Sequence, residues 1–312
     1  MPPPLDPRLA PGFKARPWWW EEAEPPDRDN VMPDRAAVAI VGGGYAGLSA
    51  ALTLRRLGHQ VVVLDAERIG WGASSRNGGM VSGGLKVAGA DLDRNHGRER
   101  AQSIVEAAAA SFPFIEETIA REGIACDYVR CGRYVGAWSP GHWDAMAARV
   151  DFLARLTGLP AEMVPKSRQR EFLGSDLYCG GMKAAATGSL HPGKYARGLA
   201  AAAERAGALL VDEVRVQGIA REGSGFRLAT TRGELRADAV LVATNGYSLD
   251  GRGTALPWLA RRLVPLNSYI IATEELPPGM IDRLFPGRRM ISDTKRILNY
   301  FRPSPDGKRV LW

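Results

Sequence analysis

Three glycines and one carboxylate near the start of the chain have the types and spacing of a phosphate-binding turn. Gly42, Gly44 and Gly47 directly follow the apolar residues 38–41, and Asp65 ends a second apolar run about 20 residues later. The first glycine permits a tight turn, the second lets a pyrophosphate approach the backbone, and the third lets a helix pack closely on a strand. Unpaired N–H groups at the start of that helix bind phosphate, and Asp65 can accept hydrogen bonds from a ribose. These residues predict a dinucleotide-binding site.

The elements that must position these residues form one βαβ unit. Strands are predicted at residues 38–41 and 61–65, joined by a helix that ends near residue 57. The stretch 36–54 carries no charge and is long enough to span a bilayer. Three adjacent glycines in its middle and the second strand after it favour a buried Rossmann core instead. A glycine-rich turn without a ligand is the alternative interpretation.

The composition indicates a globular protein and gives no sign of a nucleic-acid-binding stripe. The formal net charge is +7, but Lys and Arg are scattered among Asp and Glu, so the excess could serve phosphates and an anionic substrate. Cys126, Cys131 and Cys179 match neither a zinc site nor a CxxC pair, so we expect reduced thiols and no metal. The first residues lack a secretion signal, which predicts a cytoplasmic protein with no membrane span.

The interval between the βαβ unit and a late apolar strand at residues 239–243 is too long for a simple NAD domain. This interval favours FAD, because an isoalloxazine ring must be held between two domains. The predicted fold is α/β (α+β overall), a Rossmann-type FAD-binding domain with an inserted, mostly antiparallel substrate domain. The expected boundaries are an arm rich in Pro and Trp at 1–35, a discontinuous FAD-binding domain at 36–125 and 186–262, and a substrate domain at 126–185 and 263–312.

Several further elements are expected between and after these landmarks. Trp18, Trp19 and Trp20 should anchor the arm on the domain surface or on a partner, with an aromatic substrate site as the alternative. Pro113 should break or kink a predicted helix.

The chain ends inside an apolar strand, which suggests that a carboxy-terminal part is missing. Helices are predicted at 98–121, 143–156 and 192–206, and strands at 126–130, 133–138, 177–185 and 296–302.

Longer motifs make the chain resemble the FAD-dependent D-amino-acid-oxidase-like superfamily, and within it most closely the γ-glutamylputrescine oxidoreductases. The resemblance covers residues 17–302, and WGASSRNGG is its most specific string. Asp65 stands where this family more often has Glu, although the shorter side chain can still reach a ribose hydroxyl. The matching strings are PWWWE at 17–21, the glycine fingerprint, WGASSRNGG at 71–79, HPGKYARGL at 191–199 and ATNGY at 243–247.

The resemblance implies that FAD is the cofactor and gives roles to individual residues. Gly42, Gly44 and Gly47 would hold the pyrophosphate, Asp65 the adenosine ribose, and the Val214 backbone would lie near adenine. Residues that would line the pyrophosphate and the flavin are Arg68, Ala73, Ser74, Arg76, Asn77 and Gly79. A second flavin-contacting turn would comprise Thr244, Asn245 and Gly246. Runs of Gly, Ser and Asn offer donors to the flavin, while a turn without a ligand is the alternative for Arg76 and Asn77.

The implied reaction oxidises a C–N bond of an amine or amino acid, such as γ-glutamylputrescine, by hydride transfer to flavin N5. Oxygen or another acceptor would then take the electrons. Glycine or sarcosine oxidases and D-amino-acid oxidases or dehydrogenases share the fold, which alone cannot separate their substrates. We also consider a truncated, non-catalytic flavoprotein remnant and an NAD-dependent dehydrogenase.

Oxidation of an amine by a flavin requires no strong catalytic acid or base, although the amine must first lose its proton. No catalytic triad is visible in the sequence. The candidates for catalysis are Arg76, Asn77, Tyr300 and Arg302. Tyr300 and Arg302 alternate on a predicted strand and share one face, where Arg302 could pair with a substrate carboxylate or form a surface pair with no role in binding. His191 precedes a predicted helix, and a capping or core role is favoured over catalysis there.

Overall fold

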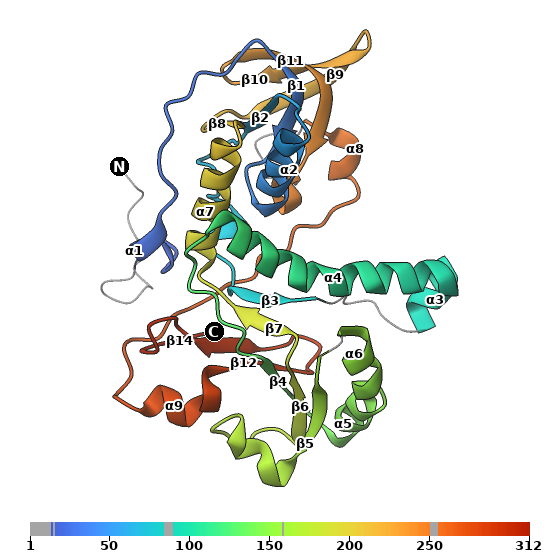
Figure 1. The fold of residues 1–312 in the computed structure, drawn as a ribbon, viewed down its shortest axis with the longest axis vertical. Helices are drawn as coiled ribbons and strands as arrows, with labels where there is room; N and C mark the ends of the chain where they lie inside the picture. The colour runs from blue at the N-terminus through green and yellow to red at the C-terminus, as the bar shows by residue number, and fades with distance from the viewer. Residues whose placement is uncertain (1–13, 15, 84–89, 158, 250–254) are drawn as a thin grey trace. The chain divides into compact units, whose positions relative to one another are not determined.

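The computed structural model describes residues 14, 16–83, 90–157, 159–249 and 255–312. The chain folds into two compact units that each combine helices with a β-sheet (Figure 1). Unit 1 takes its described residues from Met1–Arg76 and Pro192–Ser268, and unit 2 from Asn77–His191 and Tyr269–Trp312. The predicted mixture of helices and sheets is confirmed. The described residues of 77–125, a range that the sequence analysis grouped with the FAD-binding domain, lie in unit 2. The roles expected of the domains stay predictions.

Unit 1 contains the expected βαβ arrangement within a six-stranded sheet, in the order β8-β2-β1-β11-β10-β9. The first four strands of this order are parallel, and β10 and β9 are antiparallel. The register aligns Val41 with both Leu64 and Val242, so β1, β2 and β11 end together. The strands are β1 (Arg35–Val41), β2 (Val61–Leu64), β8 (Leu209–Val211), β9 (Val216–Glu222), β10 (Gly225–Thr230) and β11 (Gly233–Val242).

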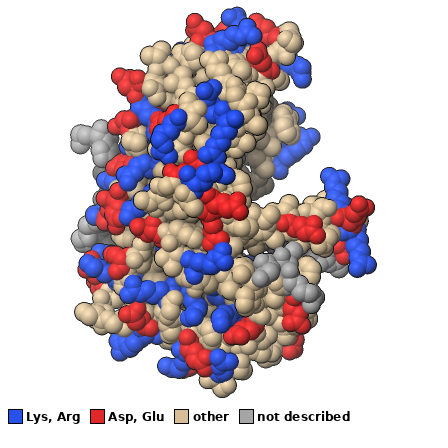
Figure 2. Space-filling view, in the orientation of Figure 1, with Lys and Arg blue, Asp and Glu red and all other residues tan. Residues whose placement is uncertain are grey.

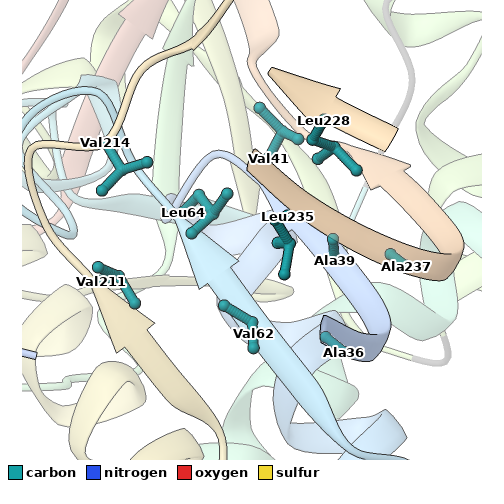
Figure 3. Packing of buried hydrophobic residues seen from close by; sticks show 10 residues of the cluster. All are labelled: Ala36, Ala39, Val41, Val62, Leu64, Val211, Val214, Leu228, Leu235 and Ala237. Atoms are coloured by element: carbon teal, nitrogen blue, oxygen red, sulfur yellow. The ribbon is translucent and has the colours of Figure 1, made fainter. Parts of the chain in front are cut away.

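Two helices of unit 1 pack against each other beside this sheet, namely α2 (Tyr45–Arg56) and α7 (Pro192–Arg205). Parallel strands bury both faces and therefore read as near-continuous apolar runs, as β1 and β2 do. Figure 3 shows side chains of β1, β2, β10 and β11 converging in one buried cluster. Leu64, Leu228 and Leu235 are fully buried in that cluster. This packing holds the end of β1, from which the glycine fingerprint continues, in the core of the unit.

The tryptophan-rich arm docks on unit 1. Trp19 and Trp20 are only 2% and 7% exposed, and α1 (Trp20–Ala23) packs on α7. Glu22 pairs with Lys194 of α7 at 2.6 Å. The expectation that the tryptophans anchor the arm on the domain surface is confirmed, because large indole surfaces are removed from water there.

Unit 2 contains a six-stranded sheet in the order β14-β13-β12-β4-β6-β5 and a separate pair, β3-β7. All these pairings are antiparallel except that of β12 with β4, which is parallel. The strands are β3 (Met80–Ser82), β4 (Arg133–Gly136), β5 (Ala161–Pro165), β6 (Gly180–Ala184), β7 (Thr187–Ser189), β12 (Met290–Asp293), β13 (Tyr300–Pro303) and β14 (Val310–Leu311). The remaining α-helices of the described chain are α3 (Ala90–His96), α4 (Arg98–Glu122), α5 (Pro140–Ala147), α6 (Val150–Thr157), α9 (Met280–Leu284) and, in unit 1, α8 (Pro257–Ala260).

Three predicted elements of unit 2 differ from the structure. The helix α4 continues through Pro113 without a break. Proline removes the hydrogen bond to the carbonyl of Ala109, and the backbone of Gly83 lies beside that carbonyl, so close that a Cβ would come within 2.8 Å of its oxygen. The single helix predicted at 143–156 is two helices, α5 and α6, and the strand predicted at 126–130 is reduced to one bridge between Val129 and Ser189.

Charged side chains of both signs are interspersed on the face shown in Figure 2, in keeping with the scattered charges of the sequence. Within the described part of the chain, no helix combines the length and the apolar character needed to cross a membrane.

Candidate cofactor site

A cavity of about 300 Å³ lies in unit 1 where three parallel strands end. Val41, Leu64 and Val242, the last residues of β1, β2 and β11, all line it. In the sheet, β1 lies between β2, the next strand in the chain, and β11, which comes much later in the chain. The cavity therefore lies at the point where the strand order reverses. Open α/β sheets bind their ligands at this position.

Gly42 and Gly44 border the cavity, and all three fingerprint glycines meet the steric demands expected of them. Gly42 has a φ of +109°, and a Cβ there would lie 2.6 Å from the oxygen of Ala243. A Cβ on Gly47 would come within 2.0 Å of the Gly42 oxygen, so only glycine lets α2 pack on β1. Gly44 lines the cavity directly before α2, whose first turn presents backbone N–H groups and the positive end of the helix dipole.

Asp65 both lines the cavity and holds the turn that carries the glycines. Its Oδ2 accepts a hydrogen bond from the Gly43 N–H at 2.7 Å, and its Oδ1 accepts one from the Glu67 N–H at 3.0 Å. Burial raises the pKa of Asp65 from 3.8 to about 6, against the effect of these two hydrogen bonds, and negatively charged Asp212 adds to the rise. The assignment of Asp65 to the adenosine ribose stays a prediction.

The raised pKa predicts how Asp65 affects stability. The folded state binds this proton more tightly than the unfolded state, so the contribution of Asp65 to stability falls as pH rises from about 4 to about 6. We expect the difference in unfolding free energy between wild type and Asp65→Asn to change across this window by at most about 3 kcal/mol. Urea unfolding of both proteins at several pH values from about 4 to about 7 tests this. A difference that is constant with pH would contradict it.

The wall opposite the glycines comes from the segment that follows β8. Val214 is 1% exposed, lines the cavity and donates its N–H to the Asp65 carbonyl at 2.7 Å. The backbone role predicted for Val214 near adenine stays a prediction. Glu67 and Arg215 also line the cavity, 3.9 Å apart between Oε1 and Nη2. The sequence analysis did not single out these two residues, although both lie within two positions of residues that it did.

The loop after β2 supplies a further part of the wall. Ala73 and Ser74 line the cavity, and the Ser74 Oγ accepts the N–H of Tyr45, the first residue of α2, at 2.9 Å. Arg68 points elsewhere: it donates to Glu24 and to the carbonyl of Pro25 in the arm. Arg68 is not among the described residues that line the cavity, and its contact with the cofactor stays a prediction.

Arg76 is enclosed by aromatic rings. Its guanidinium carbon lies 4.1 Å from the ring centroid of Trp71 and 4.7 Å from that of Trp20. The Nε and Nη2 atoms are buried, and they find no hydrogen-bond partner among the described residues. Burial lowers the pKa of Arg76. Buried donors without a partner are rare in native proteins and are explained when a ligand completes the site.

The turn after β11 closes the cavity on another side. Thr244 and Asn245 line it, and Asn245 has a φ of +47°, a left-handed conformation that Asn tolerates better than most residues. The hydroxyls of Thr244 and Ser248 are hydrogen-bonded at 2.6 Å. Gly246 lies in the same turn but is not part of the cavity wall. The sequence analysis overlooked Tyr247, whose ring borders the cavity and packs against Trp71.

The remaining candidates gather in unit 2. Asn77 accepts the N–H of Gly79 at 2.8 Å, and Tyr300 packs its ring beside Gly78. The buried Nη1 of Arg302 donates to the carbonyls of Gly79 and Leu190 at 2.9 and 2.8 Å. Burial lowers the pKa of Arg302 to about 10. These contacts show Arg302 bracing the backbone, and its pairing with a substrate carboxylate stays a prediction.

His191 is 1% exposed, and its backbone N–H donates to the carbonyl of Cys126 at 2.7 Å. It directly precedes Pro192, the first residue of α7. This buried position is the core location that the sequence analysis favoured over a catalytic one.

The fingerprint, the cavity at the strand ends and the buried donors of Arg76 define a dinucleotide-binding protein of the Rossmann type. The chain belongs to the FAD dependent oxidoreductase family (DAO), whose model matches residues 37–312. The cofactor is accordingly FAD. The residues around the cavity fit it, since glycine backbone faces the space for a pyrophosphate. Arg76 belongs to the loop that contributes Ala73 and Ser74 to the cavity wall, and its buried donors have no hydrogen-bond partner among the described residues.

Individual proteins of this family resemble the chain over most of its length. It is 32% identical to "Probable oxidoreductase OrdL" of Rhizobium meliloti, covering 96% of this chain and 68% of that protein. It is 31% identical to γ-glutamylputrescine oxidoreductase of Escherichia coli, covering 87% of this chain and 62% of that protein. The chain thus spans about two thirds of the length of these relatives.

Among solved structures, glycine oxidase from Geobacillus kaustophilus shares the fold with a TM-score of 0.65. The two are 24% identical, and the match covers 89% of this chain and 70% of that one.

Proposed function

We propose that the protein is an FAD-dependent enzyme that oxidises a C–N bond of an amine or amino acid, with a γ-glutamylputrescine-like substrate. The cavity at the ends of β1, β2 and β11, bordered by the glycine fingerprint, is the observation that carries the proposal. The similarity to γ-glutamylputrescine oxidoreductase supports the substrate class. Oxygen or another acceptor would reoxidise the cofactor.

When bound, FAD supplies the chemistry by accepting at N5 the hydride from the carbon beside the substrate nitrogen. The task of the chain is to bind and orient. Gly42 and Gly44 leave the backbone open for the pyrophosphate, and Asp65 keeps their turn in place. Arg76 offers its buried donors to a carbonyl or carboxylate oxygen. The space proposed for the cofactor is bordered on one side by Ala73 and Ser74 and on another by Thr244 and Asn245.

A glycine or sarcosine oxidase, or a D-amino-acid oxidase or dehydrogenase, is the second candidate. The 29% identity to glycine oxidase of Geobacillus kaustophilus over 220 residues favours it. A small amino acid and γ-glutamylputrescine differ in length and in the position of their carboxylate, so direct comparison of the two substrates separates the candidates.

Anaerobic mixing of the FAD-loaded chain with each amine tests the function. We expect the visible flavin absorbance to bleach with γ-glutamylputrescine and the aldehyde and ammonia or amine products to appear after air is admitted. Bleaching by glycine, sarcosine or a D-amino acid alone would favour the second candidate. A flavin spectrum unchanged by every one of these substrates would contradict both.

Gly44→Val tests the pyrophosphate site. Gly44 has φ −85° and ψ −171°, which valine adopts without strain, and the nearest atom to an added Cβ is the movable Ser74 Oγ at 2.9 Å. The variant should fold, while its side chain blocks approach to the backbone. We expect FAD affinity to fall at least about hundredfold, or about 2.7 kcal/mol. Gly141→Val is the matched control, because no atom lies within 4 Å of a Cβ there. Equal FAD affinity in both variants would contradict the assignment.

A further inference from the structure

The amino-terminal arm contacts the loop that borders the cavity through a buried hydrogen bond. The indole Nε1 of Trp20 donates to the Oγ of Ser75 at 2.9 Å. Trp20 is 7% exposed and Ser75 is fully buried, so water does not compete for this bond. A buried hydroxyl that lost this donor would be left with a desolvation penalty. The arm and the loop are therefore coupled across 55 residues of sequence.

The same indole also forms one side of the enclosure around Arg76. The guanidinium lies between the rings of Trp20 and Trp71, at 4.7 and 4.1 Å from their centroids. Aromatic faces attract a cation without using its N–H donors. This explains how Arg76 can be held in one place while its Nε and Nη2 have no hydrogen-bond partner among the described residues.

The arm is itself fixed to unit 1 at several points beyond Trp20. Arg28 pairs with Glu204 of α7 at 2.6 Å, and the Asn30 side chain donates to the carbonyl of Leu210 in β8 at 2.8 Å. Arg68 donates to Glu24 at 2.8 Å. These contacts hold the arm against α7 and β8, and they therefore fix the position of Trp20 beside the loop.

We propose that the amino-terminal arm is part of the FAD site, with Trp20 as a positioning residue that sets the conformation of Ser75 and Arg76. Ala73 and Ser74 precede these two residues in the chain and line the cavity. Ser74 also binds the first N–H of α2. This inference rests on the proposed assignment of the cavity to FAD, and of Ser75 and Arg76 to the half of FAD that carries the flavin.

Binding of FAD and of ADP distinguishes a displaced loop from a general loss of stability. ADP contains only the part of FAD that binds at the glycine fingerprint and Asp65. The hydrogen bond of Trp20 goes to Ser75 and its ring faces Arg76, and both of these residues belong to the loop. A displaced loop should therefore weaken the binding of FAD and leave the binding of ADP unchanged.

The experiment measures dissociation constants for FAD and for ADP by isothermal titration calorimetry with the apoprotein. Trp20→Phe keeps an aromatic ring and removes the donor, while Ser75→Ala removes the acceptor without touching the arm. Trp18→Phe is the matched control, because the Trp18 ring packs on Trp19 in the same arm. We expect FAD binding to weaken about tenfold in each of the first two variants, or about 1.4 kcal/mol. ADP binding should stay within about twofold of wild type, because ADP lacks the flavin half of FAD, to which this inference assigns Ser75 and Arg76.

The double variant Trp20→Phe/Ser75→Ala provides an internal check. Because both changes break one hydrogen bond, the double variant should bind FAD about tenfold more weakly than wild type, and not about a hundredfold. Should Trp20→Phe fail to fold, Ser75→Ala alone carries the comparison of FAD with ADP.

Two results would overturn the proposal while leaving the FAD site intact. One is unchanged FAD affinity in both single variants, and the other is an equal loss of FAD and ADP affinity. A wild-type chain that binds neither ligand would instead refute the proposed function, and the role of Trp20 with it.

Discussion

Gly47→Ala is expected to lower the free energy of unfolding by about 3 kcal/mol, at the upper end of the range for overpacked sites. The added Cβ would lie 2.0 Å from the Gly42 oxygen and 3.2 Å from the Ile40 side chain. The obstacle at Gly42 is backbone, so α2 must move away from β1 and the fingerprint must open. FAD binding should weaken along with stability, although Gly47 does not line the cavity.

Urea unfolding followed by far-ultraviolet circular dichroism measures the effect of Gly47→Ala. Gly141→Ala is the matched control, since the same methyl group meets no atom within 4 Å there. An unfolding midpoint for Gly47→Ala equal to that of the control would contradict the close packing of α2 on β1.

Arg302→Met is expected to destabilise unit 2 by about 3 kcal/mol. Methionine keeps an unbranched apolar stem and lacks all donors, so the buried carbonyl of Leu190 loses its bond to Nη1 at 2.8 Å and that of Gly79 loses one at 2.9 Å. The Gly79 carbonyl keeps the N–H of Leu190 at 2.8 Å, while a buried acceptor left without a donor, as at Leu190, costs about 1–3 kcal/mol. Arg302→Lys, which restores one charged donor, should recover part of the loss.

Thermal unfolding and limited proteolysis compare these variants with Arg296→Met, a change at an exposed arginine of the same segment. A stable Arg302→Met protein that keeps its fold and loses only substrate affinity would contradict the bracing role. That result would return Arg302 to the substrate-binding role considered from the sequence.

The βαβ unit could be predicted from the sequence because its determinants are local. An apolar strand, glycines that no other residue can replace and a terminal carboxylate all lie within residues 38–65. The steric reasons for Gly42 and Gly47 are backbone contacts within that unit or with the chain just after the adjacent β11. Local patterns also located α7, which begins at Pro192 as expected.

Elements that depend on distant partners were predicted poorly. Residues 126–130 have the composition of a strand, but within the described chain only Val129 finds a bridge partner, in Ser189. Pro113 lies inside the continuous helix α4, where the backbone of Gly83 lies beside the carbonyl that loses its hydrogen bond, a contact that no local pattern around the proline reveals. The arm contacts of Arg68 and the enclosure of Arg76 by Trp20 join residues at least 41 positions apart.

In the candidate site, too, most residues in local motifs were predicted and residues placed by the course of the loops were not. Gly42, Gly44, Asp65 and Val214, which the sequence analysis grouped in one site, all line one cavity, and their roles toward FAD stay predictions. Glu67 and Arg215 were missed, because they reach the cavity through the course of the loops and not through a motif. Tyr247 belongs to the ATNGY string but was given no role. The only signal in the sequence was their position beside residues already assigned.

The measurement that tests the central claim most directly is an absorbance and calorimetric titration of the purified chain with FAD, repeated with Gly44→Val. We expect wild type to bind FAD stoichiometrically with a shifted, structured flavin spectrum, and Gly44→Val to show neither the shift nor the heat of binding. A folded wild-type chain that leaves the spectrum of free FAD unchanged, or a Gly44→Val variant that binds FAD as tightly as wild type, would contradict the assignment of the cavity to the cofactor.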